Sequence, residues 1–190
     1  SLVFRYEGTL EREEYAFLDT PRTERAVVHP EASILLSEGK WFPVHALPLD
    51  AASATLKITV PLGFTVVGPG NLESIETVGV NEIFTWKSEQ PITQIPVVVS
   101  RFYRQTFDDL VIPLTFFVTE DFDRDLESLA NEVDQILEFF QSEYGLTDLQ
   151  RLNFVQVGNT ELLSKGSFGL ILLESSFIEQ ITVPKIELAK

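Results

Sequence analysis

The sequence of 190 residues is 44% hydrophobic, contains 15 Phe and carries a formal net charge of −15. The hydrophobic content predicts a packed globular protein rather than a disordered one. The charge argues against a nucleic-acid partner, because neutralising phosphates requires clustered Lys and Arg. Cysteine is absent, which excludes disulfides, thiolate metal sites and a cysteine nucleophile.

The start of the chain lies directly inside a strand-like pattern, "SLVFRYEG". It contains nothing resembling a signal peptide, and no apolar run in the sequence reaches the roughly 18–20 residues of a membrane span. Methionine is absent, even at position 1. We therefore expect an excised fragment or a processed product, and the sequence predicts no particular compartment.

Residues 1–119 read as a succession of short strands rich in β-branched and aromatic residues. The predicted strands are 2–8, 41–49, 54–63, 64–68, 81–87, 95–107 and 110–119. Turn signals such as "PLG" (61–63) and "GPGN" (68–71) separate them at a spacing typical of a β-sandwich. The sequence thus predicts an antiparallel β-sandwich, and a mainly β protein.

The pattern changes at residue 120, which begins a predicted α/β unit over 120–190. Apolar residues spaced by three and four predict a helix over 122–144: Leu126, Leu129, Ala130, Val133, Ile136, Leu137, Phe140 and Tyr144. Gly145 stands where a helix stop belongs. Strands are predicted at 151–157 and 169–173, with the loop "GNTELLSKGSFG" between the first strand and the apolar run "LILL" (170–173). Pro184 is placed to open a last helix over 185–190.

Acidic residues at the start of the predicted helix partly match a calcium-binding loop. Asp121, Asp123, Asp125 and Glu132 occupy its positions 1, 3, 5 and 12, but position 6, which needs Gly, is Leu126. Carboxylates at a helix N-terminus also complement the helix dipole. The sequence favours this second interpretation.

Histidine and serine offer few candidates for catalysis. His29 and His45 lack the spacing of a metal site, so each is interpreted as a surface or edge-strand residue. No G-x-S-x-G elbow surrounds any serine, and no histidine follows position 45. Loop chemistry is the favoured interpretation of Ser164, Ser167, Ser175 and Ser176.

Several aromatic residues of the first unit have two interpretations. Trp41, Phe42, Trp86, Phe102 and Tyr103 could form a carbohydrate-stacking face. Aromatic residues in strands more often belong to the core, because one face of each sheet must be buried. The strand context favours the core, and a carbohydrate-binding module is the less favoured hypothesis.

Short motifs along nearly the whole chain occur in the order of a known family. They are an early Y-x-G strand, a W-[FY]-P turn, a P-x-G-x-x-V strand with a G turn, a tryptophan strand, a helix ending F-F-x-x-x-[YF]-G and a G-L-[IV] segment. In this sequence they fall at Tyr6 and Gly8, at Trp41 to Pro43, at Pro61, Gly63, Val66 and Gly70, at Trp86, at Phe139, Phe140, Tyr144 and Gly145, and at Gly169 to Ile171. The chain thus resembles zinc aminopeptidases of the membrane alanyl aminopeptidase family.

This resemblance implies a β-sandwich followed by the opening of a thermolysin-like catalytic domain, which removes N-terminal residues from peptide substrates. In the family an H-E-x-x-H helix and a later glutamate hold zinc, and a G-x-M-E-N segment binds the substrate amine. By family position, Gly169 and Leu170 are implied to lie at the substrate. The segment preceding Gly169, which should carry the amine-binding glutamate, reads 165–168 "KGSF".

The zinc motif has only a degenerate counterpart. In "IELAK" (186–190), Glu187 keeps the general-base position, but Ile186 and Lys190 replace the histidine ligands and cannot bind a cation. We expect no cofactor in this chain, and zinc only if the full-length protein has an intact H-E-x-x-H motif. The leading hypothesis is an inactive N-terminal fragment of a zinc aminopeptidase. The alternative is a non-catalytic relative whose sandwich mediates protein contacts.

Truncation would also affect association. If the second unit is incomplete, the helix at 122–144 and the strand "LILL" (170–173) lack part of their packing partners. We therefore expect self-association through exposed apolar surface.

Overall fold

The computed structural model describes residue 7 and residues 26–37, 41–42, 51–88, 90–145, 148–158 and 164–175, with no account of the side chains of 164 and 165. The strand predicted over 2–8, except Glu7, most of the strand predicted over 41–49, and the helix predicted over 185–190 lie outside this part of the chain. Within it, no helix is both long and apolar enough to cross a bilayer.

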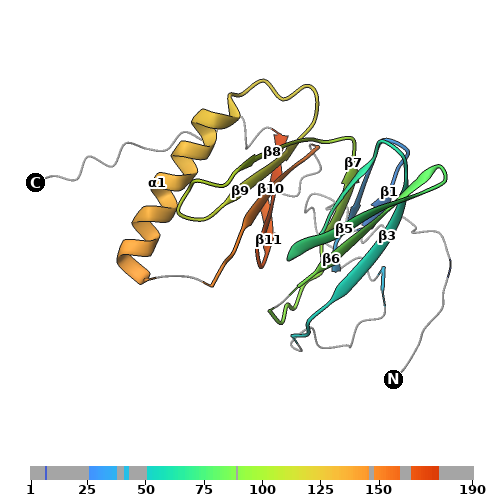
Figure 1. Ribbon diagram of the computed structural model, residues 1–190, viewed down its shortest axis with the longest axis horizontal. Coiled ribbons are helices and arrows are strands. Elements are labelled where there is room, and N and C mark those ends of the chain that lie inside the picture. The colour runs from blue at the N-terminus through green and yellow to red at the C-terminus, as the bar shows by residue number, and fades with distance from the viewer. Residues whose placement is uncertain are drawn as a thin grey trace, which may run out of the picture.

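Two antiparallel sheets form the first unit, on the right in Figure 1. One has the order β1-β2-β7-β4, with bounds Ala26–Val28, Ala32–Leu35, Val97–Ser100 and Thr65–Val67. The other has the order β3-β6-β5, with bounds Thr55–Pro61, Asn81–Lys87 and Asn71–Val78. Buried side chains of both sheets belong to one core cluster, among them Ile34, Val67 and Phe84. The predicted antiparallel β-sandwich is confirmed.

Trp86 links the two sheets of the sandwich. Its side chain is 2% exposed and lies in β6, whereas its indole Nε1–H donates to the Val66 carbonyl of β4 at 3.0 Å. A buried indole N–H needs such a partner, because an unpaired polar group is costly away from water. The hydrogen bond therefore fixes the distance between the sheets at the centre of their shared core.

A five-stranded mixed sheet forms the second unit, with the order β11-β12-β10-β9-β8. Its strands are Ser164–Ser167, Leu170–Glu174, Leu152–Val157, Leu114–Val118 and Tyr103–Phe107. β10 is parallel to both β9 and β12, while β8 and β11 pair antiparallel at the two edges. The parallel pairs place this sheet in the α/β class that the sequence predicts for the second unit.

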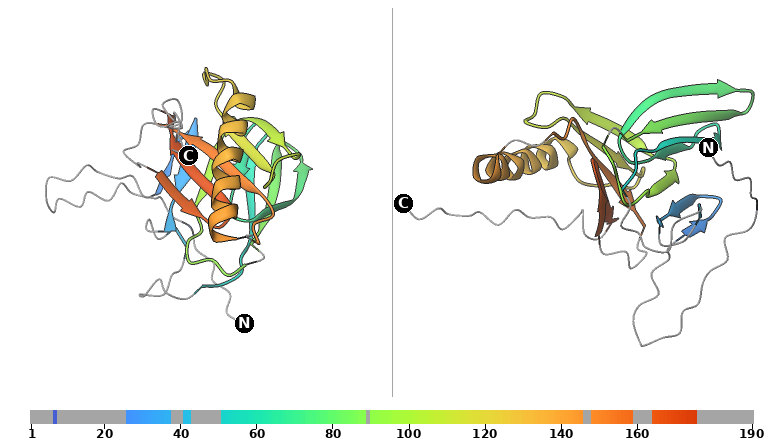
Figure 2. Two further views of the ribbon diagram at one scale, coloured as in Figure 1. Left: turned by 90° about the vertical axis from the view of Figure 1, so that its left-hand side faces the viewer. Right: turned by 90° about the horizontal axis from the view of Figure 1, so that it is seen from below.

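Helix α1 (Leu126–Tyr144) covers one face of the mixed sheet, and the sandwich covers the other. Leu114, Phe116 and Phe154 point to the helix, whereas Phe117 and Val155, next along the same strands, belong to the sandwich core. Figure 2 (right) shows the three parts in sequence, with the sheet between the helix and the sandwich. Burial on both faces explains why every residue of β9 and β10 is buried.

The helix begins four residues later than predicted and ends where predicted. Asp125 adopts an extended conformation and its carboxylate accepts from the Glu127 and Ser128 N–H groups, so α1 starts after it rather than at 122. Gly145 follows the last helical residue with φ +91°, and its N–H donates to the Gln141 carbonyl at 2.9 Å. A positive φ favours Gly at this position.

Several strands differ from the prediction. β1, β2, β5 and β11 were not predicted, and the strand expected over 95–107 divides into β7 and β8, which belong to different sheets. The expected sandwich at 1–119 includes β8 and β9, yet both strands pair within the mixed sheet. The change of sheet therefore falls between Ser100 and Tyr103, inside the unit predicted over 1–119.

The strand predicted to lose its packing partners is in fact covered. In β12, Leu170 and Leu172 are 0% and 1% exposed and belong to the core shared with the sandwich. The expectation of exposed apolar surface at 170–173 is thus wrong, because the sandwich supplies the missing cover. The end of α1 does expose apolar surface, with Tyr144 80% exposed.

Candidate functional site

A cavity of about 260 Å³ opens where the sandwich meets the mixed sheet. The sandwich contributes the start of β5 and the β6–β7 connection, and the mixed sheet contributes the approach to β10 and the β11–β12 turn. The lining residues are Gly70, Asn71, Gln90, Asp148, Leu149, Gln150, Arg151, Phe168 and Gly169. Segments far apart in sequence therefore form one site, and it includes Gly169, which the resemblance placed at the substrate.

Two glycines allow the backbone segments around this cavity to approach closely. Gly70 has φ +84°, and a Cβ there would lie 2.1 Å from the Lys87 carbonyl oxygen. Gly169 has φ +73°, and its Cβ would lie 3.2 Å from the Arg151 carbonyl oxygen. The Gly169 carbonyl also accepts from the Asn153 N–H at 2.9 Å. A side chain at either position would force these segments apart.

The charge of Arg151 at this cavity is already compensated. One guanidinium nitrogen lies 2.7 Å from Asp108 Oδ1, and another donates to Thr115 Oγ1 at 3.0 Å. The carboxamides of Asn71, Gln90 and Gln150 provide both donors and acceptors, and the 40%-exposed Phe168 provides apolar surface. Asp148 adds a carboxylate to the lining, so the combination suits a polar group that donates hydrogen bonds.

Ser167 holds the β11–β12 hairpin against the sandwich. Its hydroxyl donates to the Gln94 carbonyl in the β6–β7 connection at 3.0 Å. Ser175 is also in a structural network, since its Oγ donates to the Val157 carbonyl at 3.2 Å and accepts from Gln156 Nε2 at 3.0 Å. Neither serine is activated as a nucleophile. Ser176 and the side chain of Ser164 lie outside the described residues.

Leu170, which the resemblance also placed at the substrate, does not reach the cavity. Leu170 is 0% exposed and packs in the core that the sandwich and mixed sheet share. Its side chain therefore cannot contact a ligand, and Gly169 alone of the pair lines the cavity. Glu187, Ile186 and Lys190 lie outside the described residues.

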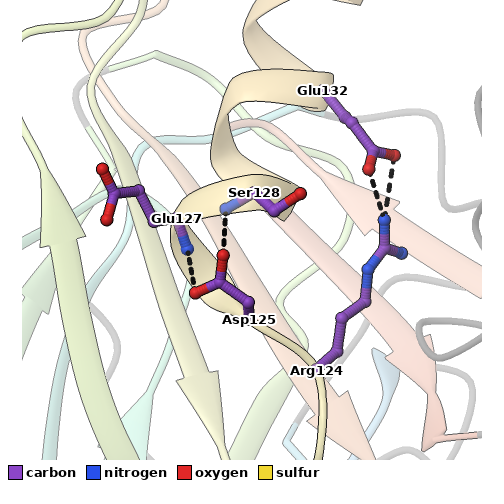
Figure 3. Close-up of polar contacts among 5 residues, drawn as sticks. All are labelled: Arg124, Asp125, Glu127, Ser128 and Glu132. Atoms are coloured by element: carbon purple, nitrogen blue, oxygen red, sulfur yellow. Dashed lines mark hydrogen bonds and ion pairs between the residues drawn. The ribbon is translucent and has the colours of Figure 1, made fainter.

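The acidic residues around the start of α1 serve as a helix cap and as partners of nearby donors. Figure 3 shows Asp125, which caps the helix, and Glu132, which lies within its first turns. Asp125 accepts from the Ser128 N–H at 3.0 Å and from the Glu127 N–H at 3.4 Å. Glu132 receives two hydrogen bonds from Arg124, at 2.8 and 2.9 Å. Asp121 accepts from the Thr119 hydroxyl. The interpretation as a helix N-terminus is confirmed for Asp125, because its carboxylate caps the first turn of α1.

Metal-binding groups are absent from the described part of the chain, where no three His, Cys, Asp or Glu side chains come together. His29 is exposed, and its Nδ1 accepts from the Glu31 N–H at 3.4 Å. His45 lies outside the described residues. The donor set seen here does not fit zinc, and the degenerate motif at 186–190 offers it no imidazole.

The aromatic residues considered for a carbohydrate-stacking face do not form one flat surface. Trp86 is buried, and Phe102 packs edge-on against Phe117 with ring centroids 6.3 Å apart. Trp41 and Phe42 also meet edge-on, at an interplanar angle of 71°. Tyr103 is exposed on its own. The core interpretation is confirmed for Trp86, and coplanar stacking on a sugar is not supported by these rings.

Sequence reasoning missed the carboxamides that shape this region. Asn71, Gln90 and Gln150 come from separate segments, and their convergence depends on how the sheets pack. Gln156 is different, since its 3% exposure within the apolar strand "LNFVQV" marks it as a buried polar residue with partners. It accepts from the Thr119 N–H at 2.8 Å and from the Thr119 hydroxyl at 2.9 Å, which joins the ends of β9 and β10.

Comparison with protein families gives no match: neither a family model nor a curated protein sequence is similar enough to the chain to be detected. Comparison of structures does give matches. An M1 zinc metallopeptidase from Deinococcus radiodurans superposes with a TM-score of 0.69 and 16% identity, over 84% of this chain and 39% of the other. A mutant of that enzyme bound to the substrate Tyr-Ser-Ala gives 0.73 and 16%, over 90% and 41%.

A two-domain M1 zinc metallopeptidase mutant bound to L-arginine is similar as well, with a TM-score of 0.66, 14% identity and coverage of 89% and 40%. These values relate the fold and not the activity, and the chain spans about two-fifths of the length of each matched structure. The likeness covers up to 90% of this chain. The chain therefore has the fold of part of an M1 zinc metallopeptidase.

Proposed function

We propose that the chain is the N-terminal portion of an aminopeptidase-type zinc metallopeptidase, and that it lacks the zinc site. The observation that carries this proposal is the shared fold, with a TM-score of 0.73 to the substrate-bound M1 enzyme over 90% of the chain. The motif order of the sequence, from Trp41 to Gly169, supports the same assignment independently. The chain would supply the sandwich and the first sheet of the catalytic domain.

The peptide substrate would approach the cavity beside Gly169 in the full-length protein. The carboxamides of Asn71, Gln90 and Gln150 can hydrogen-bond to peptide N–H and C=O groups, and Phe168 can pack against a side chain. Gly166 stands in the segment where the family has its amine-binding glutamate, so this segment offers the substrate amine no carboxylate, and the cavity has the carboxylate of Asp148 instead. Binding is then a role this chain can perform without catalysis.

Incubation with Tyr-Ser-Ala and zinc tests the absence of activity. We expect the tripeptide to remain intact by chromatography, because Ile186 and Lys190 cannot hold the metal that activates water. Steady release of tyrosine that a chelator abolishes would contradict the proposal. Aminoacyl-arylamide substrates provide a second, spectrophotometric readout of the same outcome.

A non-catalytic relative that uses its sandwich for protein contacts is the second candidate. The degenerate motif "IELAK" favours it, because the general-base position is kept while both ligand positions are lost. The coding sequence that follows Lys190 separates the two candidates. An intact H-E-x-x-H with a later glutamate supports the enzyme portion, whereas a stop codon or continued degeneracy supports the interaction protein.

A further inference from the structure

The cavity between the sandwich and the mixed sheet contains one carboxylate whose charge is not compensated. Arg151 and Asp108 pair at 2.7 Å, so their charges offset each other. The Asp148 carboxylate has no ion-pair or hydrogen-bond partner within the described part of the chain, and Asp148 is exposed, so a ligand can reach it. The described lining therefore has a net negative charge, which favours a cationic group in the cavity.

Carboxamides add hydrogen-bond acceptors to this carboxylate. Gln150 Nε2 donates to the Asp148 carbonyl at 3.3 Å, so the amide oxygen of Gln150 is left to accept from a ligand. Asn71 begins β5 and Gln90 lies in the β6–β7 connection, so the sandwich supplies two more carboxamides. A group with several N–H donors can thus find acceptors on both sides of the cavity.

Phe168 gives the same cavity an aromatic surface. It lies between β11 and β12, and its side chain is 40% exposed. A guanidinium stacks well on such a ring, through both its charge and its planar shape. The cavity volume of about 260 Å³ lies below the roughly 300–1,000 Å³ of pockets that hold whole small-molecule ligands. It therefore suits a single side chain of a longer ligand.

We propose that the cavity binds the guanidinium of an arginine side chain in a bound peptide, and that Asp148 selects it. The assignment rests on the function proposed above, since it takes a peptide to lie beside Gly169. A guanidinium has five N–H donors in one plane and no acceptor, which matches a carboxylate flanked by amide oxygens. An ammonium concentrates its donors at one atom and reaches fewer of these groups.

Nuclear magnetic resonance titration of the whole chain with two blocked tripeptides tests this selection. Both are acetylated and amidated, and a central arginine in one is replaced in the other by citrulline, whose neutral urea has nearly the same shape. The amide resonances of Gly70 and Gly169 report on the cavity. We expect the arginine peptide to bind about fivefold more tightly, as for an exposed ion pair of good geometry. This advantage should vanish at about 1 M salt, which screens exposed charges.

Asp148→Asn removes the charge and keeps the shape of the side chain. It should lower the affinity for the arginine peptide to that for the citrulline peptide, whose own binding stays unchanged. Phe168→Ala should weaken the arginine peptide about threefold, the scale of a cation–π contact at an exposed site. Asp123→Asn is the matched control, since Asp123 is equally exposed and does not line the cavity. It should change neither affinity.

The outcomes separate this assignment from the peptide role of the cavity. Equal binding of the two tripeptides, or equal effects of Asp148→Asn and Asp123→Asn, would overturn the selection by Asp148 and leave peptide binding in place. If neither peptide shifts the resonances of Gly70 and Gly169, the peptide role is wrong as well. Tyr-Ser-Ala, whose amine is free, is the third ligand. If it alone binds, and Asp148→Asn weakens it, the carboxylate serves the α-amine and the arginine assignment is wrong.

Discussion

Gly70 shows how one residue positions a whole strand. It precedes β5 with φ +84°, and the place of its missing Cβ lies 2.1 Å from the carbonyl oxygen of Lys87 in β6. Gly70 also lines the cavity between the sandwich and the mixed sheet. Both the dihedral angle and the close approach thus require glycine there.

Gly70→Ala should lower the free energy of unfolding by more than about 2 kcal/mol. The left-handed backbone alone costs a residue with a Cβ about 1–2 kcal/mol, and the clash with Lys87 adds to that. Gly63→Ala is the control, because Gly63 has φ +87° but nothing within 4 Å of the Cβ position. We expect about 1 kcal/mol for the control in urea denaturation. Equal losses would show that β5 moves away without cost.

At the scale of the element, α1 has well-defined ends. Asp125 satisfies two of the N–H groups that have no partner within the helix, and Gly145 closes the last turn. Arg124 and Glu132, with side chains 19% and 30% exposed, add an ion pair across the first turns. The N-terminal half is held by the Asp125 cap and by packing against the sheet, whereas the last turns extend into solvent.

Asp125→Ala should therefore cost about 1 kcal/mol of stability, the usual value for a lost N-cap. Asp125→Ser should restore most of it, since a hydroxyl can accept the same hydrogen bond. Asp123→Ala serves as a control, because Asp123 is exposed nearby and a surface change usually stays within about 0.5 kcal/mol. Urea midpoints measure all three. A larger loss from Asp123→Ala, or a calcium-dependent midpoint, would revive the calcium-loop interpretation.

The sequence predicted α1 well because its evidence is local. Apolar residues recur at helical spacing from Leu126 onwards, and Gly145 marks the end. β5 was missed for the opposite reason: its pairing with β6 leaves most of "NLESIETV" in solvent, so it has no apolar face to detect. β11 was missed because "SKGS" consists of small and polar residues.

The pairing of strands that are distant in sequence could not be predicted from local hydrophobic patterns. "VVVSRFYRQTF" (97–107) reads as one strand, and nothing in its hydrophobicity marks the change of sheet after Ser100. β9 pairs with β10 across the whole of α1. The candidate site shares this difficulty, since Gly169 is the one lining residue that the sequence placed at the substrate, and the carboxamides converge through tertiary packing.

At the scale of the whole molecule, the sandwich and the mixed sheet share one core. Ile34, Phe84 and Trp86 of the sandwich belong to the same cluster as Phe117 and Leu172 of the mixed sheet. Burial of this kind couples the two units, because separating them would expose apolar surface on both. We therefore propose that the sandwich and the mixed sheet unfold together.

Two probes can follow the units separately during urea unfolding. Both of the 2 Trp residues, Trp41 and Trp86, precede the mixed sheet, so their fluorescence follows the sandwich, and circular dichroism at about 222 nm follows α1. We expect coincident midpoints, the signature of two-state unfolding. Phe117→Ala should lower the free energy of unfolding by about 3–5 kcal/mol. Both midpoints should then fall together.

Phe139→Ala is the matched control, because Phe139 is 46% exposed and outside both cores. It should leave both midpoints nearly unchanged. Two separate transitions, with only the fluorescence or only the helical signal shifted by Phe117→Ala, would instead establish two independently folding domains.

The central position of the mixed sheet also governs where the chain can tolerate mutation. An ordinary strand with one wet face accepts replacement at every second position, whereas β9 and β10 are buried at all of theirs. β5, exposed along most of its length, can change freely. As substitutions accumulate, the segments with an exposed face should therefore lose their sequence similarity to relatives before β9 and β10 do. A chain can then lose detectable similarity to its relatives while these two strands still order the same layers.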